Sequence, residues 1–421
     1  MADVINKYRD EAWDFAGANT KQYTHVFHNY PAMMIPQVAG KILDIYGKDA
    51  SWLFDPYCGT GTSLVEASVR GISAIGTDIN PLARLIAKVK TTPIDVGVID
   101  EYISKFHSYI YEIKMGRNID IAIPQFDNIH YWFKEETITW LTILKHFIET
   151  VKNADVRDFF LVAFSETVRD VSLTRKGEFK LYRMSEAKIE RWNPDVAHVF
   201  MTKLVRNREG MREYLSLRSG NVRVYVYDFD TVYGIPYSSL PTDKVDIVVT
   251  SPPYGDSRTT VAYGQFSRLS NQWLGFEDKN NVDKRSMGGQ RVKEYITFNI
   301  PLIDDIILSI WHRDKRRAYD VMAFYRDYQR SISNIARLVR PGGIVAYVVG
   351  NRTVKGINIP NDEITKVLFE DCGFEHVETI IRAIPSKRMP RKNSPSNIKG
   401  MTGATMNYEY IVVLRKIIDR T

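Results

Sequence analysis

The sequence predicts an α/β fold in which a mostly parallel sheet of about seven strands is interrupted by a helical insertion. Three observations carry this prediction. Short apolar stretches alternate with helix-like stretches, a glycine-rich loop follows the first apolar stretch, and the last two strand-like stretches have no helix between them. Consecutive strands without an intervening helix pair antiparallel, so we expect a parallel sheet with an antiparallel last strand.

The first strand is expected at residues 51–54, SWLF, because this short apolar run leads directly into the loop DPYCGTGTS. A helix with apolar periodicity follows the loop, and the second strand lies within residues 71–81, GISAIGTDINP. Pro81 then begins a helix that reaches about Lys90. Together these elements form a βαβα unit, which is the opening of a doubly wound sheet.

The alternation of strands and helices stops at about residue 100. Four stretches with helical periodicity follow one another up to residue 219, and no strand pattern separates them. We therefore divide the chain into a sheet-forming domain, residues 1–99 and 220–421, and a mostly helical insertion, residues 100–219.

Strands return after the insertion at residues 222–229 and 245–251. A helix ends before the Pro-Gly-Gly tripeptide at residues 341–343, which is expected to turn the chain into the next strand. The remaining elements are a strand at residues 344–350, a helix around residues 361–370, and strands near residues 374–383 and 408–415.

The composition is that of an ordinary globular protein. Of the 421 residues 44% are hydrophobic, and no run approaches the ~18 apolar residues of a membrane span. The N-terminal residues lack the layout of a signal peptide. Two cysteines, Cys58 and Cys372, provide neither a disulfide framework nor a zinc site. We expect a cytoplasmic protein with no membrane partner and no metal.

The net charge of +7 favours a polyanionic partner. Positive charge is concentrated in residues 382–400, RAIPSKRMPRKNSPSNIKG, which contain no acidic residue and whose Pro, Ser and Gly residues indicate a loop. A contact with nucleic acid through Lys387, Arg388 and Arg391 is one interpretation, and a solvated surface loop is the other.

The loop at residues 54–62, FDPYCGTGT, has the features of a nucleotide-binding turn. Gly59 and Gly61 allow a tight turn and a close approach of the backbone to a ligand, and the next helix contributes its positive end. Asp78 follows the second strand, where such folds place the carboxylate that accepts ribose hydroxyls. A plain glycine-rich turn is the alternative, but the combination of strand, loop, helix, strand and acid favours the nucleotide site.

Four motifs together resemble those of DNA amino-methyltransferases, which methylate exocyclic amines of bases with S-adenosyl-L-methionine. DPYCGTGTSLVEA resembles their cofactor motif, and TSPPY, residues 250–254, resembles their catalytic motif. HNYPAMMIP, residues 28–36, is similar to the segment before the cofactor loop in many cytosine-N4 members. RPGGIVAYVVGN, residues 340–351, matches the strand after the catalytic motif. The resemblance covers roughly residues 22–90 and 220–415 and implies a Rossmann-like class I methyltransferase sheet.

The resemblance also implies which residues contact the cofactor. They lie in the segment before the cofactor loop, in the loop itself, and after the second and third strands. Asp230 is an alternative to Asp228, and both are otherwise explained as turn residues. The expected cofactor-binding residues are Tyr30, Pro31, Asp55, Pro56, Cys58, Gly59, Gly61, Thr62, Asp78, Ile79, Asp228 and Phe229.

Ser251, Pro252, Pro253 and Tyr254 are expected to be catalytic. The exocyclic amine of a base is a poor nucleophile because its lone pair is delocalised into the ring. The Ser251 hydroxyl and the Pro252 carbonyl, which Pro253 holds rigidly, would accept the amine hydrogens. Tyr254 would stack on a base removed from the helix. A structural turn with a packed tyrosine is the alternative.

Ser251 stands where adenine-specific members more often carry Asp or Asn, which favours N4 of cytosine as the target. N6 of adenine and an amine of RNA stay open as alternatives. The cofactor motif precedes the catalytic motif, whereas many TSPPY enzymes have the reverse order. A non-catalytic nucleic-acid-binding protein and a dehydrogenase are the rival classes, and for the dehydrogenase GTGTS breaks the GxGxxG spacing. Methylation of carbon would need a thiolate near residue 251, and the sequence has none there.

Two further segments combine basic and aromatic residues and are expected to contact DNA. LTRKGEFKLYRM, residues 173–184, contains Arg175, Lys176 and Arg183, and the segment after the catalytic motif, residues 255–273, contains Arg258. A solvated loop is the alternative for each. We expect double-stranded DNA as the substrate, and a separate cognate restriction endonuclease is a candidate partner.

Overall fold

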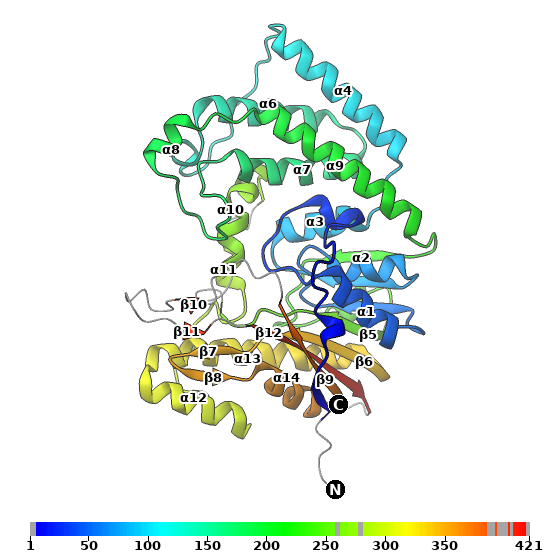
Figure 1. Ribbon diagram of the computed structural model, residues 1–421, viewed down its shortest axis with the longest axis vertical. Helices are drawn as coiled ribbons and strands as arrows, with labels where there is room; N and C mark the ends of the chain where they lie inside the picture. Colours follow the sequence, from blue (N-terminus) through cyan, green and yellow to red (C-terminus); the bar gives the residue numbers. More distant parts are fainter. Residues whose placement is uncertain are drawn as a thin grey trace.

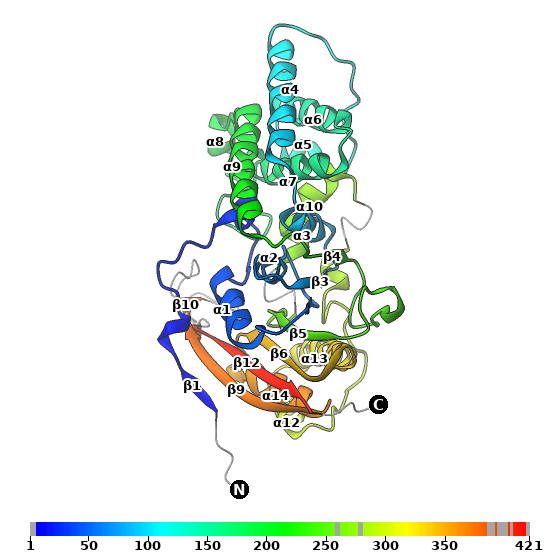
Figure 2. The ribbon, with the colours of Figure 1, turned by 90° about the vertical axis from the view of Figure 1, so that its right-hand side faces the viewer.

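An eight-stranded sheet with helices on both faces forms one end of the protein, and a group of helices forms the other end (Figures 1 and 2). Both chain termini lie at the sheet end (Figure 1). The computed structural model describes residues 6–256, 262–276, 281–384 and 407–417, and the backbone of residues 392–393 and 403–404.

The strand order is β1-β9-β12-β6-β5-β2-β3-β4. All neighbouring pairs are parallel except those of β12, which runs antiparallel to β6 and to β9. The predicted α/β class with an antiparallel last strand is therefore confirmed. The seven expected strands are β2 (Trp52–Asp55), β3 (Ser73–Thr77), β4 (Val224–Tyr227), β5 (Val245–Thr250), β6 (Val339–Val349), β9 (Phe374–Ala383) and β12 (Tyr408–Lys416).

The edge strand β1 (Lys7–Arg9) was not expected from the sequence. It pairs with β9 in the parallel direction, and Lys7 forms ion pairs of 2.5 Å with Asp362 and 2.8 Å with Glu363. Three residues with two positive charges carry no apolar periodicity. Its strand conformation comes from partners that lie more than 350 residues away in the chain.

Side chains alternate between the two faces along each strand, and each face has its own helical cover. Leu53 and Ile247 point to the face covered by α1 (Pro36–Tyr46), α2 (Thr62–Val69) and α3 (Pro81–Thr91). Phe54 and Val248 point to the face covered by α12, α13 and α14. The bounds of these last helices are Pro301–Arg313, Lys315–Leu338 and Asn361–Glu370.

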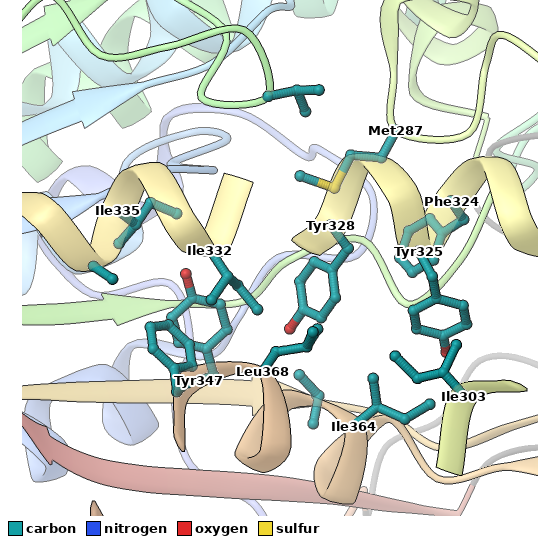
Figure 3. Packing of buried hydrophobic residues seen from close by; sticks show 14 of the residues in the cluster. Met287, Ile303, Phe324, Tyr325, Tyr328, Ile332, Ile335, Tyr347, Ile364 and Leu368 are labelled. Atoms are coloured by element: carbon teal, nitrogen blue, oxygen red, sulfur yellow. The ribbon is translucent and has the colours of Figure 1, made fainter. Parts of the chain in front are cut away.

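Aromatic rings fill the layer between α13 and the sheet (Figure 3). Tyr325 of α13 points toward Ile303 and Ile364, and Tyr328 lies beside Leu368 of α14 (Figure 3). Ile332 of α13 lies over Tyr347 of β6 (Figure 3). The Tyr325 hydroxyl donates to Asn361 Oδ1, and the Tyr328 hydroxyl lies 2.8 Å from Thr365 Oγ1. Because each hydroxyl has a polar partner, these large side chains can be buried without the cost of an unpaired polar group.

Most of the remaining helices gather at the end of the protein opposite the termini, and α11 lies nearer the sheet (Figure 1). The apolar faces of α4, α5, α6, α7 and α9 form a second core together with α3 and with α10, a helix that was not expected from the sequence. α10 packs against α7, and its Trp273 is fully buried beside Phe133 and Phe164. The bounds are α4 (Val96–Lys114), α5 (Ile129–Trp132), α6 (Glu135–Thr150), α7 (Ala154–Val171), α8 (Glu186–Arg191), α9 (Val196–Leu217), α10 (Tyr263–Leu274) and α11 (Val282–Arg285).

Residues 341–343 do not form the expected turn between a helix and a strand. β6 begins at Val339, directly after α13, and the tripeptide lies within it. Val339 is opposite Val245 but Ile344 is opposite Ile247, so the strand bulges between these positions. Gly342 has φ +76°, a conformation that favours glycine. Glycine and proline here mark a bulge, which the sequence alone does not distinguish from a turn.

Short elements complete the described part of the chain, and none of its helices is both long and apolar enough to span a bilayer. The short elements are η1 (Glu11–Trp13), η2 (Tyr23–Phe27), η3 (Tyr237–Ser239), and the strand pairs β7 (Arg352–Val354) with β8 (Ile357–Ile359) and β10 (Lys392–Asn393) with β11 (Gly403–Ala404).

The contact between α9 and η2 gives a test of the packing. A Cβ atom on Gly210 would lie 2.5 Å from the Tyr23 carbonyl oxygen. Overpacking costs about 1–3 kcal/mol, which exceeds the ~0.5–1 kcal/mol that alanine gains over glycine in a helix. We expect Gly210→Ala to lower the thermal unfolding midpoint. Gly220→Ala is the control, because its Cβ would meet no atom within 4 Å. Equal midpoints for the two variants would contradict the close contact.

Candidate active site

A pocket opens at the carboxyl ends of β2, β3, β4 and β5. Strands β3 and β4 follow on one side of β2, whereas β5 and β6 follow on the other side. Open α/β sheets bind ligands at this reversal of strand order, because the loops leave the sheet in opposite directions and form a crevice. The pocket, together with the solvent space at its open mouth, contains about 1000 Å³ free of protein atoms.

The glycine-rich loop forms the floor of this pocket. Gly59 has φ +50°, and a Cβ there would meet no atom within 4 Å, so its backbone is open to a ligand. Gly61 has φ +78° and serves packing, because its Cβ would lie 3.0 Å from Ala87 Cβ of α3. Gly61 is thus needed for the approach of two helices, while Gly59 lines the pocket.

Asp78 lies at the end of β3 and fixes the loop across the pocket. Its Oδ2 accepts a hydrogen bond of 3.0 Å from the Gly59 backbone N–H, and its Oδ1 accepts one of 2.7 Å from Asn80 N–H. The carboxylate also lines the pocket. Asp78 can therefore hold the loop in shape and face a ligand at the same time.

Asp55 connects the glycine-rich loop with the strand that leads into TSPPY. Its Oδ1 accepts a hydrogen bond of 2.5 Å from the Thr250 hydroxyl and one of 3.1 Å from the Tyr57 backbone N–H. Its Oδ2 accepts a hydrogen bond from the Ser63 hydroxyl. Asp55 is only 3% exposed, and burial raises its pKa to about 6. The pocket floor and the TSPPY strand are thus joined through one buried carboxyl group.

The hydroxyl of Tyr254 is held by one residue of the TSPPY loop and by one residue of β12. It lies 3.2 Å from Ser251 Oγ and donates a hydrogen bond of 3.1 Å to Glu409 Oε1 on β12. The other oxygen of Glu409 is paired with Arg382 of β9. Asn361 of α14 donates a hydrogen bond of 3.2 Å to the Tyr254 carbonyl. Burial, followed by the Glu409 charge, raises the pKa of Tyr254 well above its usual value.

Further walls of the pocket come from Tyr30 and Tyr263, which stack with a centroid distance of 6.0 Å and an interplanar angle of 16°. Asn80 Nδ2 donates a hydrogen bond of 2.6 Å to the Tyr30 hydroxyl and one of 3.0 Å to Ser267 Oγ of α10. Tyr263 was not singled out from the sequence. Its position depends on α10, so the only local signal was its proximity to TSPPY.

Most residues that the sequence assigned to this site meet in the pocket. The four exceptions among the expected site residues, which do not line the pocket, are Gly61, Pro252, Asp228 and Tyr254. The lining residues that were expected are Tyr30, Pro31, Asp55, Pro56, Cys58, Gly59, Thr62, Asp78, Ile79, Phe229, Ser251 and Pro253.

The third strand brings a different acid to the pocket from the one that the sequence favoured. β4 ends at Tyr227, Asp228 is exposed, and Asp230 lines the pocket. The Asp230 carboxylate accepts a hydrogen bond of 2.9 Å from the Val232 backbone N–H in the turn after the strand. Asp230, the alternative considered from the sequence, therefore takes the pocket position.

The residues expected to contact DNA fall into two groups. Arg258, Lys387, Arg388 and Arg391 lie outside the described residues. The other three belong to an exposed hairpin and contact their own protein. Arg175 Nε donates a hydrogen bond of 3.2 Å to the Arg183 carbonyl. Lys176 Nζ lies 4.8 Å from the centre of the Trp192 ring, and Arg183 forms an ion pair with Glu186.

Arg382, the first residue of the basic segment, is not part of a solvated loop. It belongs to β9, its exposed fraction is 3%, and it donates a hydrogen bond of 2.8 Å to the Trp13 carbonyl. Within the described ranges, no group of three His, Cys, Asp or Glu side chains could hold a metal ion.

Comparison with known proteins gives the family. No protein-family model matches the chain. The chain is 42% identical to the type II methyltransferase M.MvaI of Kocuria varians over 429 residues, which cover 97% of this chain and 94% of that protein. The chain belongs to the type II methyltransferases. It is a DNA methyltransferase of restriction and modification, with DNA as its substrate and S-adenosyl-L-methionine as its cofactor.

Two other relatives are more distant. The type II methyltransferase M.BsoBI of Geobacillus stearothermophilus is 20% identical over 86% of this chain and 80% of that protein. A tRNA (guanine(10)-N2)-dimethyltransferase of Methanothermobacter thermautotrophicus is 38% identical over 52 residues, 12% of this chain and 16% of that protein. The similarity to this tRNA methyltransferase is confined to a short segment, whereas the similarity to M.MvaI and M.BsoBI covers most of the chain.

The two aspartates near β3 and β4 can be separated by calorimetry of cofactor binding. Asp78→Ala removes a carboxylate that lines the pocket and shapes the loop. We expect it to weaken S-adenosyl-L-methionine binding about 10- to 150-fold, which corresponds to ~1.5–3 kcal/mol for a bond to a charged group. Asp228→Ala removes an exposed carboxylate and is the matched control. Equal affinities for both variants and the wild type would exclude Asp78 from the site.

Proposed function

We propose that this methyltransferase modifies N4 of cytosine in a specific duplex DNA sequence, after the target base has been rotated out of the helix. The observation that carries the proposal is the Ser251 hydroxyl, which lines the pocket at the head of the TSPPY loop and has its hydrogen-bond direction set by Tyr254. A serine at this position, rather than Asp or Asn, favours cytosine over adenine.

The pocket residues fit the cofactor at its chemically distinct ends. Asp78 and the open backbone of Gly59 suit the ribose and its neighbourhood, and Phe229 and Asp230 suit the adenine end. When bound, S-adenosyl-L-methionine supplies an electrophilic methyl group on a sulfonium sulfur. Ser251 lies in the same pocket, so the attacking amine and the methyl group would meet there.

The direction of the hydrogen bonds explains how Ser251 would act. The Tyr254 hydroxyl has one hydrogen, which it gives to the Glu409 carboxylate, an acceptor without hydrogen. The 3.2 Å contact between Tyr254 and Ser251 then requires Ser251 to donate. Both lone pairs of the Ser251 oxygen stay directed away from that bond. They are available to accept a hydrogen of the exocyclic amine, which makes the nitrogen more pyramidal and more nucleophilic.

The Tyr254 ring would then support the extruded base. Base-modifying enzymes require a base outside the stack, and an aromatic face contributes ~1–3 kcal/mol per stacked base. Asn361 and Glu409 hold this residue at its carbonyl and its hydroxyl, so the ring orientation is set before DNA binds. Preorganisation of this kind lowers the entropy that must be lost on binding.

Variants of the TSPPY loop test this assignment. Ser251→Ala is expected to lower the single-turnover rate of methyl transfer while cofactor and DNA affinities stay near those of the wild type, because the acceptor matters mainly as the nitrogen rehybridises. Tyr254→Ala is expected to lose both transfer and base extrusion, reported by a fluorescent base at the target. Tyr254→Phe keeps the ring but not the bond to Glu409, and should retain extrusion better than transfer.

The product identifies the base. Mass spectrometry of nucleosides from methylated DNA should give N4-methylcytosine. N6-methyladenine would refute the cytosine assignment and leave transfer to an exocyclic amine intact. Transfer to RNA in preference to duplex DNA would refute both. If Tyr254→Ala extrudes the base and transfers the methyl group as well as the wild type does, then this tyrosine is only a packing residue.

We further propose the helical segment, residues 100–219, as a region of target recognition, with Arg175 on its exposed hairpin as a contact to phosphate. A restriction endonuclease encoded separately is proposed as the partner of this enzyme, and the cytoplasm as its location. The proposal for the helices is supported by their position as a second group, at the end of the protein opposite β1, β9 and β12 (Figure 2).

The basic segment around residue 390 is expected to contact the DNA backbone. Replacing Arg388 and Arg391 by Gln should flatten the dependence of log affinity on log salt concentration by about one unit for each phosphate that is no longer neutralised. Cofactor affinity should not change. The double variant Arg340→Gln and Arg415→Gln is the control, because these side chains belong to the sheet and are paired with Asp246 and Glu375. The same salt slope in both double variants would assign the segment to the solvated surface.

A further inference from the structure

An arginine from the turn after β6 contacts the exit of the TSPPY loop. Thr250 at the end of β5 lies opposite Tyr347 in β6. Five residues further along each segment, Gly255 follows the TSPPY motif and Arg352 opens β7. Arg352 Nη1 lies 3.3 Å from Asp256 Oδ2. The two neighbouring strands thus bring the residues after the motif and this arginine together.

The Arg352 guanidinium occupies the space in which a side chain at residue 255 would lie. A Cβ atom on Gly255 would be 1.7 Å from Nη1 and 2.3 Å from Cζ of Arg352. The backbone of Gly255 is not left-handed, so its conformation does not require glycine, whereas the close approach of the guanidinium does. The planar and weakly hydrated guanidinium suits a contact with a backbone in a way that the compact ammonium of lysine does not.

Asp256 is a buried carboxylate that two arginines hold. Its exposed fraction is 0%, and its Oδ2 lies 3.2 Å from Arg317 Nη2 of α13 as well as near Arg352. Arg317 also pairs with Asp320 at 2.7 Å, and Asp320 pairs with Arg291 at 2.7 Å. A buried carboxylate is tolerated only with such partners. Because Arg317 is one of them, Asp256 stays paired even when Arg352 is replaced.

Stability alone does not explain the position of Arg352. The exposed fraction of its side chain is 12%, yet within the described part of the chain its Nε and Nη2 have no hydrogen-bond partner. Buried donors that stay unpaired lower the stability of a protein. The Phe324 ring lies 5.6 Å from Cζ and supports the positive charge through its face. The guanidinium is therefore held on the loop although two of its nitrogens stay unpaired, which is typical of a functional position.

We propose that Arg352 is a positioning residue for methyl transfer, which fixes the exit of the TSPPY loop by filling the space beside Gly255 and by pairing with Asp256. The inference rests on the proposed role of this loop at the target amine. Arg352 does not line the cofactor pocket, and it follows the last residue of the motif at residues 340–351. Neither the pocket nor the family motifs therefore account for it.

A second contact at the same place supports this role. Asn361 Nδ2 donates a hydrogen bond of 3.2 Å to the Tyr254 carbonyl and one of 2.6 Å to the Gly350 carbonyl. Together with Arg352, it ties three consecutive residues, 254–256, to the segment directly after β6. The start of the loop is bound to the sheet as well, so the carbonyls and the aromatic ring of the loop keep one orientation. A reacting group held in one orientation transfers faster than one that must find it.

A double-mutant cycle on the transfer rate tests the contact. Gly255→Ala should lower the single-turnover rate at saturating DNA and cofactor about 10- to 100-fold, because its Cβ displaces the guanidinium. Arg352→Ala should lower the rate by a similar factor. In the Arg352→Ala background the space is empty, so adding Gly255→Ala should change the rate by no more than about twofold. Arg352→Lys keeps the charge without the plane and should restore little of the rate.

Affinities and unfolding midpoints of the same variants separate positioning from stability. We expect the affinities for cofactor and DNA to stay within about twofold of the wild type, so that the loss lies in kcat rather than in KM. Arg291→Met is the matched control, because it removes the outermost arginine of the same series of ion pairs. It should lower the unfolding midpoint and leave the transfer rate unchanged.

Three results would overturn the inference. Independent losses in the cycle would mean that the two residues do not act through their contact. Weaker DNA binding with an unchanged rate at saturating DNA would make Arg352 a contact to DNA phosphate. An equal loss of rate in Arg291→Met would make the effect one of stability. If Ser251→Ala lowers the rate and Arg352→Ala does not, only the positioning role is refuted, whereas full activity of both variants would refute the proposed catalytic loop itself.

Discussion

The buried carboxyl group of Asp55 is the constraint on which the geometry of the site depends. Its pKa of about 6 leaves it charged at neutral pH, and a buried charge is tolerated only when donors surround it. Those donors come from three places: Thr250 at the end of β5, the Tyr57 backbone in the glycine-rich loop, and Ser63 in α2. Movement of either loop would break one of these bonds. The floor of the cofactor pocket and the start of the TSPPY loop therefore keep a fixed separation.

The two loops are also held by partners that lie outside them. Asp78, from β3, holds the glycine-rich loop at Gly59, while Glu409 and Asn361 hold the TSPPY loop at Tyr254. Glu409 belongs to the antiparallel last strand, and its second oxygen pairs with Arg382 on the neighbouring strand β9. The last strands thus do more than extend the sheet. They provide the carboxylate that fixes the direction of the hydrogen bond between Tyr254 and Ser251.

The sequence predicts those parts of the fold and site whose causes are local. Apolar runs located the seven main strands, and the glycine-rich loop with Asp78 located the pocket. Residues whose position depends on distant contacts were missed: β1 forms only beside β9, and Tyr263 reaches the pocket only because α10 is buried against α7. The sequence favoured Asp228 over Asp230, whereas Asp230 is the one that lines the pocket. β4 ends at Tyr227, and a shift of two residues after a strand end changes which side chain faces the pocket.

The helix α10 shows how the two cores depend on each other. It begins at Tyr263 in the pocket wall and ends next to Trp273 in the helical core, and these two residues are about 15 Å apart along the helix at 1.5 Å per residue. Asn80 binds both Tyr30 and Ser267, so the start of α3 and the middle of α10 share one hydrogen-bonding group. The pocket wall at Tyr263 is therefore positioned from the helical core, whereas the pocket floor is positioned from the sheet. Tyr30 and Tyr263 line the pocket and also pack with the helical core, so the two share side chains.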